Sequence, residues 1–304
     1  MFTILTAPTS WKYRYVLFLK KFLKRLLWVK TFWPNAVIES IVNGLKELSI
    51  DYTLNPIEKN ISEIVYVPLG IDTLKYALEL KKTWRIQKLI VWPNISIPES
   101  ACDIFFHPLI DHIIVPSLWL QNYFFDILGK KDIRISIIPA WVDDLGSRIS
   151  ADKILIYKKD CSERLFQTVC SFLDENVIDY EVFIYGKFLK KDYVESLSRA
   201  KWLIYLQASE SQWIALHEAW MKDVPTLVWN RGYWEYSKKK WYDKNISAPY
   251  LTKSCGEFFL DEHDFKEVFY LFFRRLSLYS PREYSLQYFT HKKAISNLLI
   301  FLHK

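Results

Sequence analysis

The chain has 304 residues, of which 51% are apolar and 25% are charged, and this balance is typical of a globular protein and excludes a disordered one. Its length suits two domains of roughly 150 residues each. No uncharged apolar stretch reaches the ~20 residues that a transmembrane helix needs. The net charge of +7 indicates an anionic partner, such as nucleotide phosphates, acidic lipid or nucleic acid.

Two further features indicate a cytoplasmic protein. The four cysteines include no C-x-x-C pair, so we expect reduced thiols. Residues 1–6 have the pattern of a strand, so we expect no cleavable signal peptide.

Strand-like runs alternate with longer helical patterns along the whole chain. In chain order the runs are residues 2–6, 51–54, 63–67, 88–92, 112–115 and 134–138, then 153–157, 180–185, 201–206 and 226–229. Six of them end at a proline, which has no N–H group to donate to a sheet. The alternation predicts an α/β protein with two doubly wound parallel sheets, which bind ligands outside the carboxyl ends of their strands. We expect the domain break in the polar stretch 142–150.

One βαβ unit of the second half carries two carboxylates, Glu210 and Glu218, eight residues apart. Apolar runs flank the pair, so the order reads as strand, polar turn, helix, short loop and strand. At about 1.5 Å per residue the two acids lie roughly 10–12 Å apart, about the length of a sugar–diphosphate–ribose. The helix N-terminus between them offers free N–H groups and a positive dipole end, which suit a diphosphate.

This pattern resembles the Glu-x7-Glu signature of the retaining, family-4-type glycosyltransferases, which have the two-domain GT-B fold. The residues that fit the signature are Glu210, Ser211, Glu218, Ala219 and Pro225. A bare pair at this spacing also occurs by chance as two solvated acids on a helix. The flanking strands, the serine after the first glutamate and the Val-Pro exit favour the resemblance.

Segments along most of the chain are similar to other parts of the family pattern: 92–94, 111–117, 137–143, 184–186 and 280–284. The resemblance implies two Rossmann-like domains facing a cleft. Residues 1–147 would form the acceptor-binding domain and 148–285 the nucleotide-sugar-binding domain. Residues 286–304 would form a helix that returns to the first domain.

The resemblance also implies roles for particular residues. Glu210 would hydrogen-bond the donor sugar, and Glu218 would hold the ribose hydroxyls, because a carboxylate accepts two hydroxyl hydrogens in a fork. Backbone groups of Ser211, Gln212 and Trp213 would meet the diphosphate, and Gly186 would lie at the strand end beneath the base.

Two basic side chains are also expected after the first strand of the second domain. Lys158, Lys159 and Arg164 follow that strand, and Lys159 and Arg164 would stabilise charge on the leaving diphosphate together with Glu210 as the catalytic set. The alternative for the three is an ordinary solvated basic loop.

The resulting prediction is a glycosyltransferase that takes a UDP- or GDP-sugar, needs no metal and retains the anomeric configuration. The acceptor would be a cell-surface glycan, lipopolysaccharide or glycolipid. The alternative is a non-catalytic carbohydrate- or partner-binding protein on the same fold. Nucleic-acid binding rests on positive charge alone and lacks a recognisable motif, so we expect none.

Tryptophan stands at three motif positions where glycine is expected: Trp92, Trp141 and Trp213. The chain has 13 Trp and 7 Gly, whereas ordinary usage is about 7% Gly, or roughly 21 here. Trp11 and Trp33 are further cases. One hypothesis is that these residues are UGA codons that the source reads as glycine. The other is that Trp213 fills the site of a non-catalytic relative.

Residues 11–30 contain seven basic residues and no acid. On a helical wheel the basic side is Lys20, Lys21, Lys24 and Arg25, and the apolar side is Leu19, Phe22, Leu23, Leu26 and Leu27. This pattern is typical of a helix on anionic lipid, here the inner face of the plasma membrane. It also fits the first helix of the N-terminal domain, with its basic face in water.

Overall fold

The computed structural model describes residues 1–9, 34–92, 104–128, 134–209, 213–236 and 239–303, in two compact units. The first unit comprises Met1–Pro139 and His291–Lys304, and the second comprises Ala140–Thr290. Each contains a parallel sheet with helices, which confirms the predicted fold class. The basic segment 11–30, Trp11 and Trp33 lie outside the described residues.

The sheet of the first unit has six parallel strands in the order β2-β1-β3-β4-β5-β6. Their bounds are Tyr52–Leu54, Phe2–Ile4, Ile64–Val67, Lys88–Val91, His112–Val115 and Ile135–Ile137 in that order. Strands β3, β4 and β5 are almost continuous runs of buried apolar residues. Such runs occur where helices cover both faces of a parallel sheet.

The described part of this unit contains the helices α2 (Pro34–Glu47), α3 (Ile71–Lys82), α5 (Leu118–Leu128) and α11 (His291–His303). Helix α3 packs on β3 and β4, α5 packs on β5 and β6, and α11 packs on α2. Gly44 permits the close approach of α2 and α11, because a Cβ atom there would lie 2.7 Å from Cγ1 of Ile295.

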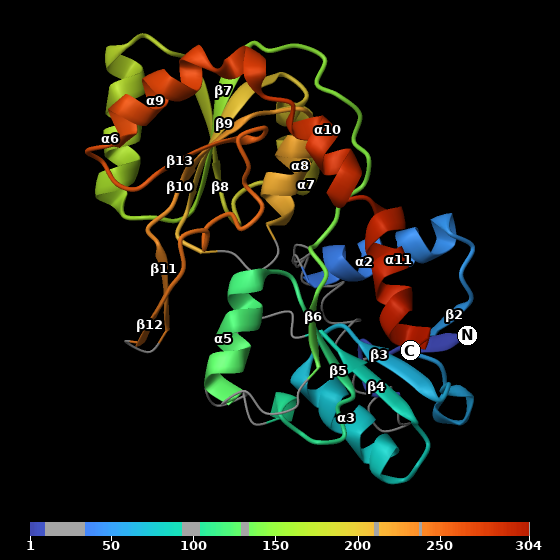
Figure 1. The fold of residues 1–304 in the computed structure, drawn as a ribbon. Coiled ribbons are helices and arrows are strands. Elements are labelled where there is room, and N and C mark those ends of the chain that lie inside the picture. The colour runs from blue at the N-terminus through green and yellow to red at the C-terminus, as the bar shows by residue number, and fades with distance from the viewer. Residues whose placement is uncertain (10–33, 93–103, 129–133, 210–212, 237–238, 304) are drawn as a thin grey trace. The chain divides into compact units, whose positions relative to one another are not determined.

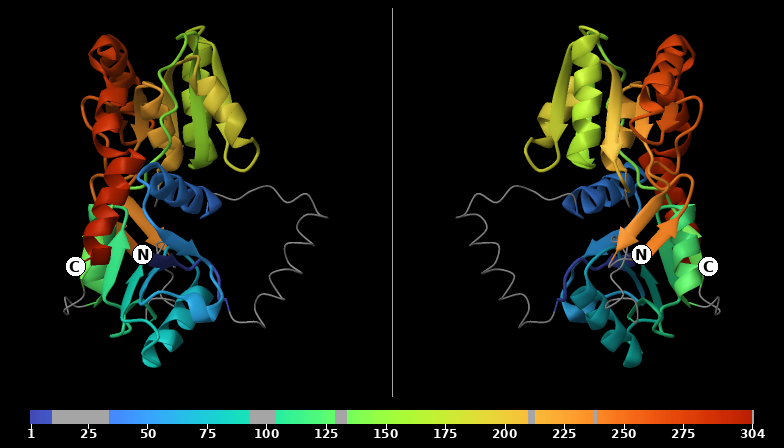
Figure 2. Two further views of the ribbon diagram at one scale, coloured as in Figure 1. Left: turned by 90° about the vertical axis from the view of Figure 1, so that its right-hand side faces the viewer. Right: turned by 90° about the vertical axis from the view of Figure 1, so that its left-hand side faces the viewer.

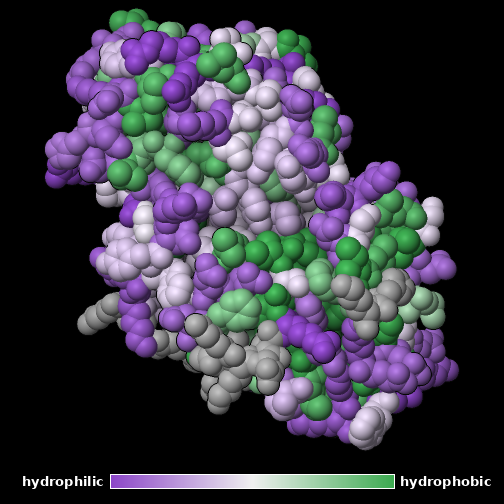
Figure 3. Space-filling model, in the orientation of Figure 1, coloured by the Kyte–Doolittle hydropathy of each residue, from purple (hydrophilic) through white to green (hydrophobic). Residues whose placement is uncertain are grey.

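The sheet of the second unit has five parallel strands in the order β13-β10-β9-β7-β8. Their bounds are Gly256–Phe259, Thr226–Trp229, Ala200–Gln207, Lys153–Asp160 and Tyr180–Ile184 in that order. Helices α6 (Glu163–Glu175) and α9 (Phe265–Arg274) cover one face, and α7 (Lys190–Leu197) and α8 (Ile214–Met221) cover the other (Figure 1). Helix α10 (Pro281–Tyr288) packs on α8. Hydrophilic side chains cover much of the outer surface seen in Figure 3.

Alternating side chains of the central strands fill the two layers of this unit. Ile154 and Ile156 of β7 join the core under α6 and α9, where Phe172 packs edge-on against Phe265 and Phe269. The intervening residues Leu155 and Tyr157 are equally buried on the opposite face, because successive residues of a strand point to opposite sides.

The division between the units falls earlier than the expected boundary at 147/148. Ala140, Trp141 and Val142 are buried within the second unit. The Nδ1–H group of His217 donates to the carbonyl of Ala140 at 3.0 Å, and the backbone N–H of Val142 donates to Phe289 at 3.3 Å. The polar composition after residue 142 suggested a linker, but the apolar residues just before it belong to the second core. The chain rejoins the first unit at His291, later than the expected boundary at 285/286.

Strand β13 and the hairpin of β11 (Tyr233–Tyr236) and β12 (Lys239–Tyr242) were not predicted from the sequence. Gly256 opens β13 at φ 154°, where a Cβ atom would lie 1.8 Å from the carbonyl oxygen of Thr226. The hairpin projects from the second unit as a separate two-stranded sheet (Figure 2). Among the described residues, no helix has the length and apolar character to span a bilayer.

Four of the described helices end in the same left-handed turn without a glycine. The left-handed residues are Ser49, Trp84, Val177 and Asp223, which follow α2, α3, α6 and α8. At Trp84 the backbone bonds are those of a Schellman motif, from Trp84 to Lys81 and from Arg85 to Leu80. Glycine is the usual residue there, because any Cβ atom is strained at positive φ. Trp84 is 89% exposed, so no packing of its indole offsets that strain.

Replacing Trp84 by glycine is therefore expected to stabilise the protein by about 1 kcal/mol, and Val177→Gly by a similar amount, because each substitution removes left-handed strain. Urea unfolding of the variants measures the change. Thr83→Gly is the control without left-handed strain, since Thr83 has φ −92°. It should destabilise the protein, because it adds freedom to the unfolded chain and removes the hydrogen bond from the Thr83 hydroxyl to the Leu80 carbonyl at 3.0 Å. Equal destabilisation by all three substitutions would contradict the attribution of left-handed strain to Trp84 and Val177.

The buried ring of His217 is expected to make the protein less stable in acid. Burial lowers the pKa of His217 from 6.5 to about 3, with an opposing effect of the Ala140 carbonyl. Below pH 6.5 the unfolded chain takes up a proton that the folded protein does not, so the free energy of unfolding falls as the pH drops toward 3. In His217→Gln the free energy of unfolding, measured between pH 7 and pH 3, should no longer show the decrease that His217 causes. His263→Gln, at an exposed histidine, is the control and should keep that decrease.

Candidate active site

The strand order of the second unit reverses between β7 and β9. From β7 the chain crosses to β8 at one edge, and from β9 it continues to β10 and β13 at the other. In open parallel sheets ligands bind outside the carboxyl ends of the strands at such a switch point. The loops that follow β7 and β9 carry most of the site residues expected from the sequence, so the topology brings those loops to the same edge.

Lys158 and Lys159 lie near the carboxyl end of β7 and make different contacts. The ammonium of Lys158 lies 2.5 Å from a carboxylate oxygen of Glu163 and 3.9 Å from the ring centre of Phe166, both on α6. Lys159 lies 4.5 Å from the ring centre of Tyr185, which follows β8. Lys158 is thus held against α6, whereas Lys159 is held at the loop after β8.

Arg164 is in the first turn of α6, and its side chain is 77% exposed. Its Nε atom lies 3.6 Å from a carboxylate oxygen of Glu262, in the turn before α9. This contact directs Arg164 toward the α9 side of the unit. Its expected partnership with Lys159 on a diphosphate remains a prediction.

The loop after β9 leads into α8 through Trp213. Of the expected site residues in this loop, Glu210, Ser211 and Gln212 lie outside the described residues. Trp213 is fully buried at φ 47° and ψ 26°, in the left-handed region, as the residue before α8. Its indole N–H donates to the carbonyl of Ser247 at 2.8 Å, and the Ser247 hydroxyl donates to Ala208 at 2.8 Å. The segment around Ser247 therefore holds both ends of this loop.

Trp92 and Trp141, the other tryptophans at motif positions, are also buried, but neither has a positive φ. Only Trp213 of the three therefore has the backbone conformation that favours glycine.

Glu218 lies inside α8, whose eight residues are all buried. The ammonium of Lys190 lies 2.7 Å from Oε1 of Glu218 as an ion pair, without the alignment of a good hydrogen bond. The other oxygen, Oε2, has no partner among the described residues. Burial raises the pKa of Glu218, Lys190 opposes the rise and Asp143 adds to it. The site thus contains a desolvated carboxyl group with unused hydrogen-bonding capacity.

Lys190 is a site residue that the sequence reasoning missed. It is the first residue of α7, and half of its side chain is exposed. A cation at a helix N-terminus opposes the helix dipole, so a lysine there is locally unfavourable. That local conflict was the available signal, but its partner Glu218 is far away in the sequence.

Gly186 forms the turn after β8 at φ 80°. The backbone N–H of Lys187 donates to Ile184 at 2.9 Å across this turn. A Cβ atom at Gly186 would meet nothing within 4 Å, so the backbone conformation and not crowding explains the glycine. The structure thus places Gly186 at the same strand edge as Lys159.

Comparison with known protein families gives no match, and neither does comparison with curated protein sequences. Comparison with solved structures gives matches over the whole chain at very low sequence identity.

Three of these matches have similar length. A lipopolysaccharide outer core galactosyltransferase, WaaB, gives a TM-score of 0.60 at 11% identity, over 98% of each chain. WaaG, a glycosyltransferase involved in lipopolysaccharide biosynthesis, gives a TM-score of 0.55 at 8% sequence identity, over 100% of each chain. AviGT4, a glycosyltransferase involved in avilamycin A biosynthesis, gives 0.55 at 12% over 99% of this chain and 96% of the other. With its two parallel-sheet units, the chain has the GT-B glycosyltransferase fold.

Proposed function

We propose that the protein is a glycosyltransferase that transfers a sugar from a nucleotide-sugar donor to a glycan or lipid-linked acceptor with retention of configuration. The observation that carries this proposal is the buried Glu218 beside the switch point, with Oε2 unpartnered among the described residues. Burial of a carboxylate without a full set of hydrogen bonds costs free energy, so such groups are concentrated at functional sites.

A ribose suits this carboxylate better than most small ligands. Its two neighbouring hydroxyl groups can each donate to one carboxylate oxygen. In the absence of a ligand, the Lys190 ammonium partly compensates for the burial of the carboxylate through its ion pair with Oε1. Binding of the ribose would replace that contact with Lys190.

The chemical step would rest on the catalytic set expected from the sequence: Glu210 at the donor sugar, with Lys159 and Arg164 opposite the charge that develops on the leaving diphosphate. Two lysines and an arginine at the end of β7 and the start of α6 would supply the compensating positive charge in place of a metal ion. The proposed acceptor class is supported by two structural relatives, which are described as a lipopolysaccharide outer core galactosyltransferase and a glycosyltransferase involved in lipopolysaccharide biosynthesis. The basic segment 11–30 would hold the enzyme at the inner face of the membrane.

One observation favours the alternative, a non-catalytic GT-B-like binding protein. The indole of Trp213 is buried where the family has a glycine, next to the expected diphosphate site. A tryptophan side chain there would hinder a diphosphate from approaching the backbone N–H groups closely.

Nucleotide binding tests the proposed donor site directly. We expect UDP or GDP, but not CMP, to raise the thermal unfolding midpoint with or without EDTA, because a ligand at ~100 times its dissociation constant adds about 2.7 kcal/mol. Glu218→Gln should lose this shift, since the amide has one acceptor oxygen in place of two and its NH2 group cannot accept a hydroxyl hydrogen. Glu195→Gln on the exposed face of α7 is the matched control. The proposal is wrong if Glu218→Gln binds nucleotide like the parent protein.

A substitution at position 213 tests whether the indole obstructs the site. Trp213→Gly is expected to bind the nucleotide at least about tenfold more tightly, a gain of about 1.4 kcal/mol, while losing stability because the indole leaves a cavity. Trp213→Phe keeps the bulk and should show no gain in calorimetric affinity. Equal affinities for the two variants would exclude obstruction by the side chain.

The codons test the recoding hypothesis independently of binding. UGA codons at positions 92, 141 and 213, with glycine masses in the protein isolated from its source, are the expected result. UGG at all three positions would exclude recoding.

A further inference from the structure

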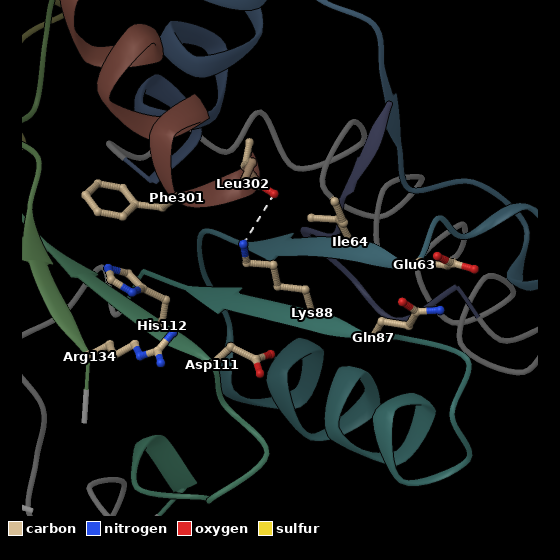
Figure 4. A pocket seen from close by; sticks show the side chains of 9 residues that line it. All are labelled: Glu63, Ile64, Gln87, Lys88, Asp111, His112, Arg134, Phe301 and Leu302. Carbon is tan, nitrogen blue, oxygen red and sulfur yellow. Dashed lines mark hydrogen bonds between the residues drawn. The ribbon is translucent and has the colours of Figure 1, made fainter. Parts of the chain in front are cut away.

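A pocket of about 590 Å³ lies in the first unit, at the amino ends of strands β3, β4, β5 and β6 (Figure 4). Ile64 of β3 and Phe301 and Leu302 of α11 form the apolar part of its lining. The expected ligand edge of a doubly wound sheet is the carboxyl edge. The pocket is therefore separate from the acceptor face expected of this unit.

Lys88 and Arg134 bring positive charge to one part of the pocket, whereas Glu63, one of its two acids, lies at the other end. Asp111 is already engaged, because Lys81 forms an ion pair with it and the backbone N–H of Leu89 donates to it at 2.6 Å. The ammonium of Lys88 contacts only the carbonyl of Leu302 at 3.4 Å among the described residues. The guanidinium of Arg134 has no partner among them. Two cations are thus left for an anion to bind.

His112 also lines the pocket, beside Phe301 of α11. Its ring stacks on Phe301 with the ring centres 4.5 Å apart, and its buried Nε2 atom has no partner among the described residues. Burial, together with the nearby positive charges of Lys88 and Arg134, lowers the pKa of His112 from 6.5 to about 4. Burial also lowers the pKa of Lys88. The imidazole is therefore neutral at pH 7 and can donate one hydrogen bond to an anion.

The other end of the pocket is suited to hydroxyl groups. Glu63 precedes β3 and Gln87 precedes β4, and their side chains have no partners among the described residues. Figure 4 shows these two at one end of the pocket, His112 and Arg134 at the other, and Lys88 between them. A carboxylate and an amide can hydrogen-bond several hydroxyl groups of a polyol.

A structural role for Lys88 alone does not explain this arrangement. A cation beside the last carbonyls of a helix is favourable, and Lys88 lies at the end of α11 in that way. That role gives no function to the Arg134 guanidinium and the His112 Nε2 atom, neither of which has a partner within the described part of the chain.

We propose that this pocket binds a small phosphorylated polyol, such as a sugar phosphate, with its phosphate among Lys88, Arg134 and His112 and its hydroxyl groups at Glu63 and Gln87. The pocket volume lies within the usual range of roughly 300–1,000 Å³ for small-molecule sites. This site belongs to the first unit and does not depend on the donor site proposed at Glu218.

Calorimetric titration of the full chain with glucose 6-phosphate, inorganic phosphate and glucose tests the proposal. We expect glucose 6-phosphate to bind more tightly than phosphate, and glucose not to bind. Arg134→Gln should weaken glucose 6-phosphate by about tenfold or more, because it removes a charge-assisted hydrogen bond. Arg134 is exposed and unpaired among the described residues, so this variant should fold normally. Glu63→Gln should weaken the binding of glucose 6-phosphate but not the binding of phosphate.

Two matched variants separate this pocket from the donor site and from general surface charge. Lys59→Gln removes an exposed cation of the same unit outside the pocket, and Lys159→Gln removes one at the proposed donor site. Neither should change glucose 6-phosphate binding. The proposal is overturned if no binding is measured, if phosphate binds as tightly as glucose 6-phosphate, or if Lys159→Gln removes binding while Arg134→Gln does not.

Discussion

Both units depend on one constraint, which is that a parallel sheet must be covered by helices on both faces. The middle residues of the central strands β3, β7 and β9 are buried, so every connection between neighbouring strands has to carry a covering element or cross over the sheet. In the second unit this requirement brings the chain back across β7 to begin β9 on its other side. The reversal leaves the carboxyl ends of β7 and β9 side by side, and the candidate active site is built there.

Helix α8 covers one face of the second sheet and also carries a residue of the candidate active site. All of its residues are buried, including His217 and Glu218. His217 stacks on Phe289 at 4.1 Å and bonds the Ala140 carbonyl, so it fixes the helix within its unit. Within the described residues, the carboxylate of Glu218 has only the ion pair with Lys190. The two neighbouring polar residues therefore have different roles, one in packing and one with capacity left for a ligand.

The scarcity of glycine has a structural cost at helix ends. Trp84 and Val177 occupy left-handed positions in which a side chain is strained and, at the surface, gains nothing from packing. Trp213 is different, because its left-handed backbone is combined with a fully buried indole that bonds Ser247. Position 213 therefore combines the backbone of a glycine with the packing of a tryptophan. That combination connects the unusual composition to the site itself.

The sequence by itself determined the α/β class, the two parallel sheets and most of their strands, because hydrophobic runs, prolines and their spacing are local signals. It also identified Glu218 as a candidate, through the turn and helix that follow β9. Only the tertiary structure decided the partner of that carboxylate, since Lys190 comes from another βαβ unit. Likewise, it placed Ala140–Val142 in the second core, added β13 at the sheet edge and assembled the pocket around Lys88 and Arg134. Each of these depends on contacts between residues far apart in the chain, which no local pattern specifies.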